Sequence, residues 1–493
     1  MGRDIEARTY TREQRQRYRE KVRHCLDVFE QMLAADSFDF DEPMTGLEIE
    51  LNLVGADYRP KMDNADVLAA IADPEFQTEL GRFNIEFNVP PGPLAGDALA
   101  GLEESLRTSM NAAERRSAAL GTHIVMTGIL PTVMPETFEG DWMSENLRYA
   151  AINDAVLTAR GEDINLDIEG PGGETLIRYI DSVAPESACT SVQLHLQIRP
   201  EEFADHWNAA QVLAGAQLAL AANSPFLMGR QLWAETRIVL FEQATDTRPI
   251  EYANQGVRPR VWFGERWITS IFDLFEENAR WFPALLPELD PEDPKAVFDA
   301  GGVPQLSEMR LHNGTIYRWN RPIYDVGGGA PHLRLENRVL PAGPTIVDTL
   351  ANAAFYYGTL RTLVAEDRPV WSRMAFSTAA ANFEQGARSG IDADLFWPGV
   401  GEMPASELIL RHLLPLAHQG LQDWGVDAGI RDRLLGVVEG RCKTGINGAQ
   451  WQVEAVRSLE SSGIPRVEAL RRMVAAYTER MHTNTPVHTW EKI

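Results

Sequence analysis

The stretch GLEIELNL at residues 46–53 alternates polar and apolar side chains along almost its whole length. This period of two is typical of a β-strand, whose successive side chains point to opposite faces. One face carries Glu48, Glu50 and Asn52, whereas the other carries only leucine and isoleucine. The stretch therefore predicts a strand with an apolar back and a front of carboxylates and an amide.

Three further stretches repeat this alternation: residues 83–89, 191–198 and 332–339. Their other face is mostly Leu, Ile, Val and Phe. We predict that the four strands form one sheet whose polar front is a site for divalent metal and phosphate. The polar positions are Asn84, Glu86, Asn88, Gln193, His195, Gln197, Arg334, Glu336 and Arg338.

The simpler explanation of each strand is a polar face turned to water, as in most half-buried antiparallel sheets. A solvated face usually mixes lysine, threonine and serine with glutamate, however, and none of the four strands contains lysine. At an effective dielectric constant near 20, each pair of carboxylates about 4 Å apart costs roughly 4 kcal/mol. Carboxylates gathered on one concave face therefore need cations or protons, which favours a metal site.

The composition is that of an acidic globular protein of 493 residues, 44% hydrophobic and 24% charged, with a net charge of −25. This charge argues against nucleic acid or an anionic membrane as the main partner. The three cysteines lie far apart, which argues against a disulfide framework and favours a reduced, cytoplasmic location. We expect no signal peptide in residues 1–31 and no membrane-spanning segment, because no apolar run is suitable.

The remaining patterns predict an α+β fold, with a mostly antiparallel sheet and helices packed on its apolar face. A hairpin is expected at residues 165–180, a further strand at 123–130 and irregular structure at 254–330. Pro90 to Pro93 should end the second strand sharply. A short helix that is capped by Asn64 or Asp66 should run to Ile71. The other predicted helices cover residues 11–34, 97–120, 201–222, 344–365, 405–421, 429–439, 450–459 and 466–481.

We predict three parts along the chain, without an internal repeat or a low-complexity linker. An N-terminal helical arm covers residues 1–43, and a catalytic α+β domain covers residues 44–370. A C-terminal helical region at 371–493 packs on the catalytic domain.

Common nucleotide and hydrolase signatures are absent: the sequence has no GxxxxGK[ST], HExxH or GxSxG. Gly327-Gly328-Gly329 precedes a strand rather than opening a helix, so a flexible turn is its better interpretation. Cys189 lies just before a predicted strand and is more simply a small buried residue than a nucleophile. No covalent nucleophile is evident.

Two short pairs carry the most chemical information. Glu48 and Glu50 are two residues apart on one strand, which suits two adjacent metal sites. Glu336 and Arg338 place a hard-metal ligand beside a permanent cation that can neutralise a transferring phosphoryl group. Taken alone, the second pair is also compatible with a salt bridge within the sheet, and an isolated His195 is more often structural.

Three or four glutamates with one histidine suit Mg²⁺ or Mn²⁺ better than Zn²⁺. Magnesium sites combine carboxylates with substrate phosphates. Arg338, Arg334 and Arg237 could contact such phosphates, and together they point to ATP as the phosphate source.

The order of these motifs resembles the glutamate–cysteine ligase type 2 family of carboxylate–amine ligases, in the glutamine synthetase superfamily. Glu-x-Glu on an early strand is followed by NIEFN at 84–88, TSVQLH at 190–195, NSPF at 223–226 and HLRLENR at 332–338. The resemblance covers roughly residues 44–490. Within that range, residues 382–395 and 445–452 resemble the C-terminal helices of the family.

The resemblance implies an antiparallel sheet that forms a funnel with two or three Mg²⁺ ions at its base. Glu50 and Glu86 would hold one metal, while Glu48, His195 and Glu336 would hold another. Arg338 would contact the phosphates. The implied reaction uses ATP to phosphorylate a carboxylate, classically the γ-carboxyl of glutamate. An amine, classically that of cysteine, then attacks the acyl phosphate, which gives an amide, ADP and phosphate.

The chain departs from the family pattern in its first 43 residues and in the enlarged regions 160–186 and 254–330, which leaves the amine and the carboxylate substrate open. His312 and Arg318 could bind the carboxylate substrate or simply belong to a loop. The expected partners are ATP and small amino acid or amine substrates, with a homodimer as the candidate assembly. Two other functions stay open: a metal-dependent amide or phosphoester hydrolase, and an inactive binding homologue.

Overall fold

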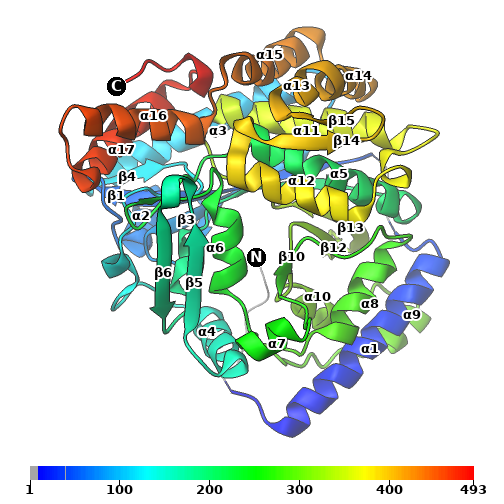
Figure 1. The fold of residues 1–493 in the computed structure, drawn as a ribbon. Coiled ribbons are helices and arrows are strands. Elements are labelled where there is room, and N and C mark those ends of the chain that lie inside the picture. The colour runs from blue at the N-terminus through cyan, green and yellow to red at the C-terminus, as the bar shows by residue number, and fades with distance from the viewer. Residues whose placement is uncertain (1–8, 39, 41) are drawn as a thin grey trace.

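A seven-stranded sheet brings the four predicted strands together (Figure 1). In this computed structural model, residues 9–38, 40 and 42–493 are described, so part of the predicted N-terminal arm lies outside the described residues. Every strand pair in the sheet is antiparallel, which confirms the predicted fold class. Its order is β12 (Asn320–Gly327), β13 (Ala330–Asn337), β7 (Val192–Gln197), β1 (Thr45–Gly55), β3 (Asn84–Gly92) and β2 (Phe76–Thr78), and β4 (Thr122–Val125) pairs with the end of β1.

The register places the predicted polar side chains on one face of this sheet. Glu50 lies opposite Glu86 across the β1–β3 pair, and His195 lies opposite Glu336 across the β7–β13 pair. Glu48 is opposite Asn88 on one side and Gln193 on the other. Directly opposed residues of an antiparallel pair project to the same side. The alternation along each strand therefore adds up to a continuous polar face.

Helices α5 (Phe203–Ala221) and α11 (Ile346–Val364) cover the apolar side of the sheet, and almost every residue of both is buried. Two side chains tie these helices to strand backbones. The Trp207 indole donates to the Asn320 carbonyl at 2.9 Å, and the Tyr357 hydroxyl donates to the His195 carbonyl at 2.9 Å. The helical layer therefore fixes the strand that carries His195.

A third helix, α12 (Phe376–Ser389), lies directly against α5 (Figure 1). Glycines allow the close approach of the two backbones. A Cβ atom on Gly215 would lie 2.5 Å from the Asn382 carbonyl oxygen, and one on Gly386 would lie 2.4 Å from the Gly215 carbonyl oxygen. Any side chain at either position would force the helices apart.

Three sequence predictions about this architecture are wrong. The region 254–330 is not irregular, because it contains three helices and the edge strand β12. Pro90 and Pro91 do not end the second strand, since β3 continues to Gly92. Proline has no backbone N–H to donate to a neighbouring strand. On the β2 side this costs no hydrogen bond, because β2 pairs only with residues 85–87 of β3 and both prolines lie beyond them. The strand predicted at 123–130 is short and ends at Val125.

The other elements surround these layers (Figure 1). Those before α5 are α1 (Arg12–Ala34), α2 (Asn64–Ile71), α3 (Ala98–Ala118), α4 (Leu147–Arg160) and the predicted hairpin β5 (Ile164–Glu169) and β6 (Thr175–Ile180). The middle of the chain adds β8 (Phe226–Leu227), β9 (Arg230–Gln231), α6 (Thr236–Ala244), α7 (Ile250–Asn254), β10 (Val261–Trp262), α8 (Ile271–Trp281), α9 (Pro294–Asp299), α10 (Ser307–Asn313) and β11 (Tyr317–Arg318).

After α12, the chain forms the small hairpin β14 (Asp394–Trp397) and β15 (Gly401–Pro404) and then mostly helices, as predicted. These are α13 (Ala405–Leu408), α14 (Leu414–Asp423), α15 (Ala428–Thr444), α16 (Gly448–Ser461) and α17 (Arg466–Thr483). Among the described helices, none combines the length and apolar content that crossing a membrane requires. The domain boundaries at residues 43 and 370 stay predictions.

A buried ion pair joins the C-terminal helices to the layer behind the sheet. Arg441 of α15 donates to the Asp348 carboxylate of α11 at 2.7 Å and to the Asn352 side-chain oxygen at 2.6 Å. Both charged side chains are almost completely buried. Removal of one partner would leave the other charge buried without compensation.

We expect Arg441→Met to lower the free energy of unfolding by about 3–5 kcal/mol, because Asp348 loses its counter-ion. The measurement is urea-induced unfolding followed by circular dichroism. Lys443→Met is the matched control: Lys443 belongs to the same helix, but its ion pair with Glu439 is exposed and contributes about 0–1 kcal/mol. Equal unfolding midpoints for the two variants would contradict the structural role of the buried pair.

Candidate functional site

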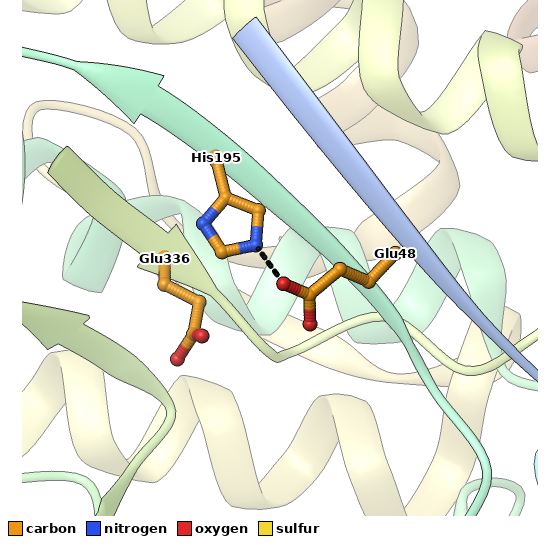
Figure 2. Close-up of side chains that lie close together, drawn as sticks. All are labelled: Glu48, His195 and Glu336. Atoms are coloured by element: carbon orange, nitrogen blue, oxygen red, sulfur yellow. Dashed lines mark ion pairs between the residues drawn. The ribbon is translucent and has the colours of Figure 1, made fainter. Parts of the chain in front are cut away.

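Glu48, His195 and Glu336 converge from three neighbouring strands, β1, β7 and β13 (Figure 2). Each offers one ligand atom, and these three atoms lie within 4.8 Å of one another. The family resemblance implies that these three residues hold one cation. We call them the first ligand group.

Guanidinium groups hold Glu336 of this group in its ionised form. Arg321 makes a bidentate contact with Glu336, with distances of 2.6 Å from Nε to Oε2 and 2.9 Å from Nη2 to Oε1. Arg338 Nη1 lies 3.5 Å from the same Oε2 atom. Burial raises the pKa of the Glu336 carboxyl, but the charges of Arg321 and Arg338 outweigh it and bring the pKa well below its ordinary value.

The His195 imidazole lies between two charged neighbours. Its Nε2 atom is 3.0 Å from Glu48 Oε1, an ion-pair distance, yet it has no partner in hydrogen-bond geometry among the described residues (Figure 2). Burial raises the pKa of the Glu48 carboxyl, but the imidazole more than compensates, so the net pKa is lowered. Arg334 Nε donates to His195 Nδ1 at 3.3 Å. Cation binding through Nε2 therefore requires the ring proton to move to Nδ1 and this contact to break.

A second ligand group lies beside the first and consists of Glu50, Glu79 and Glu86, again with ligand atoms within 4.8 Å of one another. The sequence predicted Glu50 and Glu86 here but missed Glu79. Glu79 follows the three-residue strand β2, too short to show a clear alternation. The sequence signal that could have identified Glu79 is its position two residues after Gln77, because residues two apart on a strand point to the same side. Gln77 lies opposite Glu86 in the sheet.

The carboxyls of Glu50 and Glu79 in this second ligand group have raised pKa values, in contrast to Glu336 of the first. Burial, which outweighs the opposing charge of Arg338, raises the pKa of Glu50 to about 7, and the neighbouring Glu86 adds to the shift. Burial and the charge of Glu86 also raise the pKa of Glu79 well above its ordinary value. The buried Glu86 Oε1 atom has no hydrogen-bond partner among the described residues. Three glutamates with such an unsatisfied oxygen fit a hard divalent cation.

Arg338 links the two groups, because it contacts Glu336 of the first and lines a cavity beside the second. It also donates to the Gln193 side-chain oxygen, while Gln193 donates to Glu50 at 2.9 Å. Burial lowers the pKa of Arg338, but the surrounding carboxylates, Glu336 first, raise it above its ordinary value. Arg338 is thus a fixed cation between the two groups.

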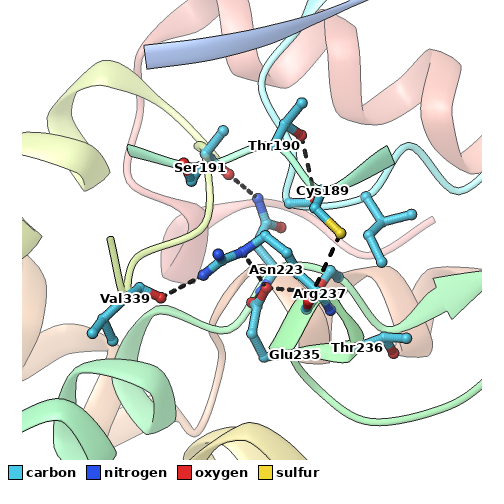
Figure 3. Close-up of polar contacts among 12 residues, drawn as sticks. Cys189, Thr190, Ser191, Asn223, Glu235, Thr236, Arg237 and Val339 are labelled. Carbon is cyan, nitrogen blue, oxygen red and sulfur yellow. Dashed lines mark hydrogen bonds and ion pairs between the residues drawn. The ribbon is translucent and has the colours of Figure 1, made fainter. Parts of the chain in front are cut away.

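Arg237, the other predicted phosphate contact, is buried and already engaged (Figure 3). Its Nε donates to Glu235 at 3.2 Å, and its terminal nitrogens donate to the carbonyl oxygens of Arg338 and Val339. Glu235 in turn accepts from the Asn223 amide at 2.8 Å. Arg237 lines the same cavity, but its hydrogen bonds hold the backbone that follows β13.

His312 and Arg318 do not line the cavity or the cleft of the site. His312 Nε2 is 2.9 Å from the Asn278 carbonyl oxygen, and Arg318 is bonded to Glu277 at 3.0 Å. Burial lowers the pKa of His312 to about 4. Both residues belong to a buried network, which favours the structural alternative over a substrate contact.

Two openings reach the ligand groups. A small cavity lies at the second group, and its lining includes Glu50, Glu79, Arg237 and Arg338. A larger cleft reaches Glu48, His195 and Arg334 of the polar face. Sequence reasoning missed Glu186, which lines the cavity, because this glutamate lies in a turn outside any periodic pattern.

The family model of glutamate–cysteine ligase family 2 matches residues 44–476. No curated protein matches the chain in sequence. Among solved structures, a glutamate–cysteine ligase from Francisella tularensis in complex with AMP is similar, with a TM-score of 0.56 and 12% identity over 91% of this chain and 90% of that one.

A bifunctional glutathione synthetase from Pasteurella multocida has a TM-score of 0.51 and 11% identity, over 93% of this chain and 55% of that one. At these identities, the two structures show that the fold is shared. The family model, in contrast, covers most of the sequence, including both ligand groups. The chain therefore belongs to glutamate–cysteine ligase family 2, a family of ligases.

Proposed function

We propose that this protein is an ATP-dependent carboxylate–amine ligase that releases ADP and phosphate. One observation carries the proposal: two ligand groups share one polar face, and Arg338 contacts the first and lines the cavity of the second. Family membership supports a ligase. The proposed substrates are the γ-carboxyl of glutamate and the amine of cysteine or another amino compound.

The reaction has two steps. A carboxylate oxygen of the first substrate attacks the γ-phosphorus of ATP, the bond to the β,γ-bridging oxygen breaks, and ADP leaves. The nitrogen of the amine then attacks the acyl carbon, loses a proton and expels phosphate. Phosphorylation is needed because a free carboxylate is a poor electrophile, and no covalent nucleophile of the protein takes part.

The two openings suggest where each substrate binds. The larger cleft at the first ligand group is the better fit for a nucleotide, and Arg334 lies on its wall. The smaller polar cavity at the second ligand group suits a small carboxylate substrate. Arg338 contacts Glu336 of the first group and lines the cavity at the second, and it would neutralise charge on the transferring phosphoryl group.

The ligand groups are proposed to hold Mg²⁺ or Mn²⁺. Glu48, His195 and Glu336 would hold one cation, and Glu50, Glu79 and Glu86 another. Such cations supply charge neutralisation for phosphate oxygens. In the first group, Arg321 occupies both Glu336 oxygens, so it would have to share or release one of them.

The proposed location is the cytoplasm. Cys25, Cys189 and Cys442 are all free thiols, which is usual in a reducing compartment. A homodimer stays a prediction.

Glu336→Gln and Arg338→Ala should each lower ATP-dependent turnover at least about 100-fold, because the first weakens a ligand of the proposed cation and the second removes the positive charge placed at the phosphoryl group. The assay measures ADP release with glutamate and a panel of amines, and circular dichroism verifies the fold. Arg411→Ala is the control, because Arg411 is exposed and forms an ion pair with Glu407 one helical turn away. Wild-type rates from both site variants would refute the assignment. Hydrolysis of an amide without ATP would favour the hydrolase alternative.

Glu86→Gln should remove or weaken one class of Mn²⁺ site, since it deletes a charged ligand from the second group only. Calorimetric titration of the purified protein with Mn²⁺ measures stoichiometry and affinity. We expect at least about a tenfold loss of affinity at one site and none at the other. Glu104→Gln, at an exposed glutamate of α3, should bind as the wild type does. Unchanged titrations for Glu86→Gln would exclude a cation at this group.

A further inference from the structure

Glu186 is a carboxylate at the edge of the cavity. It lies in the short turn Ala184–Ala188 that precedes β7. Backbone bonds hold this turn: the Glu186 amide donates to the Val183 carbonyl and the Cys189 amide to the Glu186 carbonyl, both at 2.9 Å. Within the described part of the chain, no hydrogen bond or ion pair reaches the Glu186 side chain. The turn is therefore stable without that side chain.

The surroundings of Glu186 select for a positive charge. The side chain is only partly exposed and lines the cavity with Glu50, Glu79 and Asn84. Arg237 and Arg338 lie on the wall as well, but their guanidinium groups already contact Glu235 and Glu336. Burial, together with the charge of Glu50, raises the pKa of Glu186 to about 7. A cationic group beside Glu186 would offset the free energy that ionisation of this carboxyl costs.

Glu186 is not a member of either ligand group, since its oxygens are not among the atoms that lie within 4.8 Å of one another. It is thus available to a substrate that enters the cavity. The proposed reaction brings such a charge, because amino acids and amines carry ammonium groups at neutral pH.

We propose that Glu186 binds the ammonium group of an amino substrate in the cavity beside Glu50 and Glu79. This inference rests on the proposed ligase function and adds a specificity residue to it. The ammonium group has two possible sources: the amino acid that is phosphorylated or the amine that attacks. If it belongs to the attacking amine, the ammonium group first gives one proton to the Glu186 carboxylate, which frees the lone pair of the nitrogen. The nitrogen then bonds to the acyl carbon, the bond from that carbon to the phosphate oxygen breaks, and the second proton leaves with the phosphate.

The test is equilibrium binding by calorimetry, without turnover, to the full chain with Mg²⁺ present. Two probe pairs differ only in the amino group: glutamate against glutarate, and cysteine against 3-mercaptopropionate. For the pair whose ammonium group meets Glu186, E186Q should bind the amino compound at least about tenfold more weakly, since a charged hydrogen bond is lost. Its affinity for the deaminated compound should not fall. The pair that shows this difference identifies the source.

Several controls separate this role from a structural one. E186D should recover part of the affinity, and E145Q, at an exposed glutamate before α4, should bind as the wild type does. Thermal melting shows whether each variant folds, and if E186Q does not, E186A takes its place. Equal affinity of wild type and variant for both amino compounds would overturn the proposal. The proposal would also be overturned if the wild type bound neither amino compound. It would be overturned as well if E186Q bound one Mn²⁺ equivalent fewer than the wild type, because Glu186 would then be a metal ligand.

Failure of the ligase function itself gives a different result. In that case, the wild type releases no ADP with any amine, whatever its binding. A binding difference between E186Q and wild type would still support an ammonium site.

Discussion

Mutual repulsion of carboxylates is the constraint on which this site depends. Two groups of acidic side chains share one face of the sheet, and within each group the ligand atoms lie within 4.8 Å of one another. The protein offsets this repulsion in two ways. Arg321 and Arg338 neutralise Glu336 in the first group, whereas Glu50 and Glu79 of the second group hold protons more tightly than usual. The first group is therefore ion-paired, and the second is ready to exchange protons for a cation.

Such a face persists only if the backbone beneath it is rigid. Helices α5 and α11 supply that rigidity through close packing and through two side chains that bind strand carbonyls. Glycines at the contact of α5 with α12 let a further helix pack against this layer. The buried Arg441–Asp348 pair then anchors the C-terminal helices. Thus residues far from the polar face keep its opposed charges in register.

Much of the fold and most residues of the polar face could be predicted from the sequence, because strand alternation is a local property. Their division into two ligand groups came from the family resemblance. The polar residues of β1, β3, β7 and β13 lie on one face, as expected. Predictions failed where the signal depends on context. The edge strand β12 contains Pro322 and lies in a region rich in Trp, Pro and Gly, so Arg321 was missed. Glu79 follows a strand that is too short to show a clear alternation, and Glu186 lies in a turn.

The sequence by itself determined which side chains share a face of each strand, since successive residues must point to opposite sides. It also determined the choice of carboxylates over lysines on that face. Only the tertiary structure decided that His195 lies opposite Glu336, that Arg321 occupies Glu336 and that Glu79 joins Glu50 and Glu86. Strand order and register arise from packing between segments that are separated in the sequence, by more than a hundred residues in the case of β7 and β13, and local pattern carries no record of that packing.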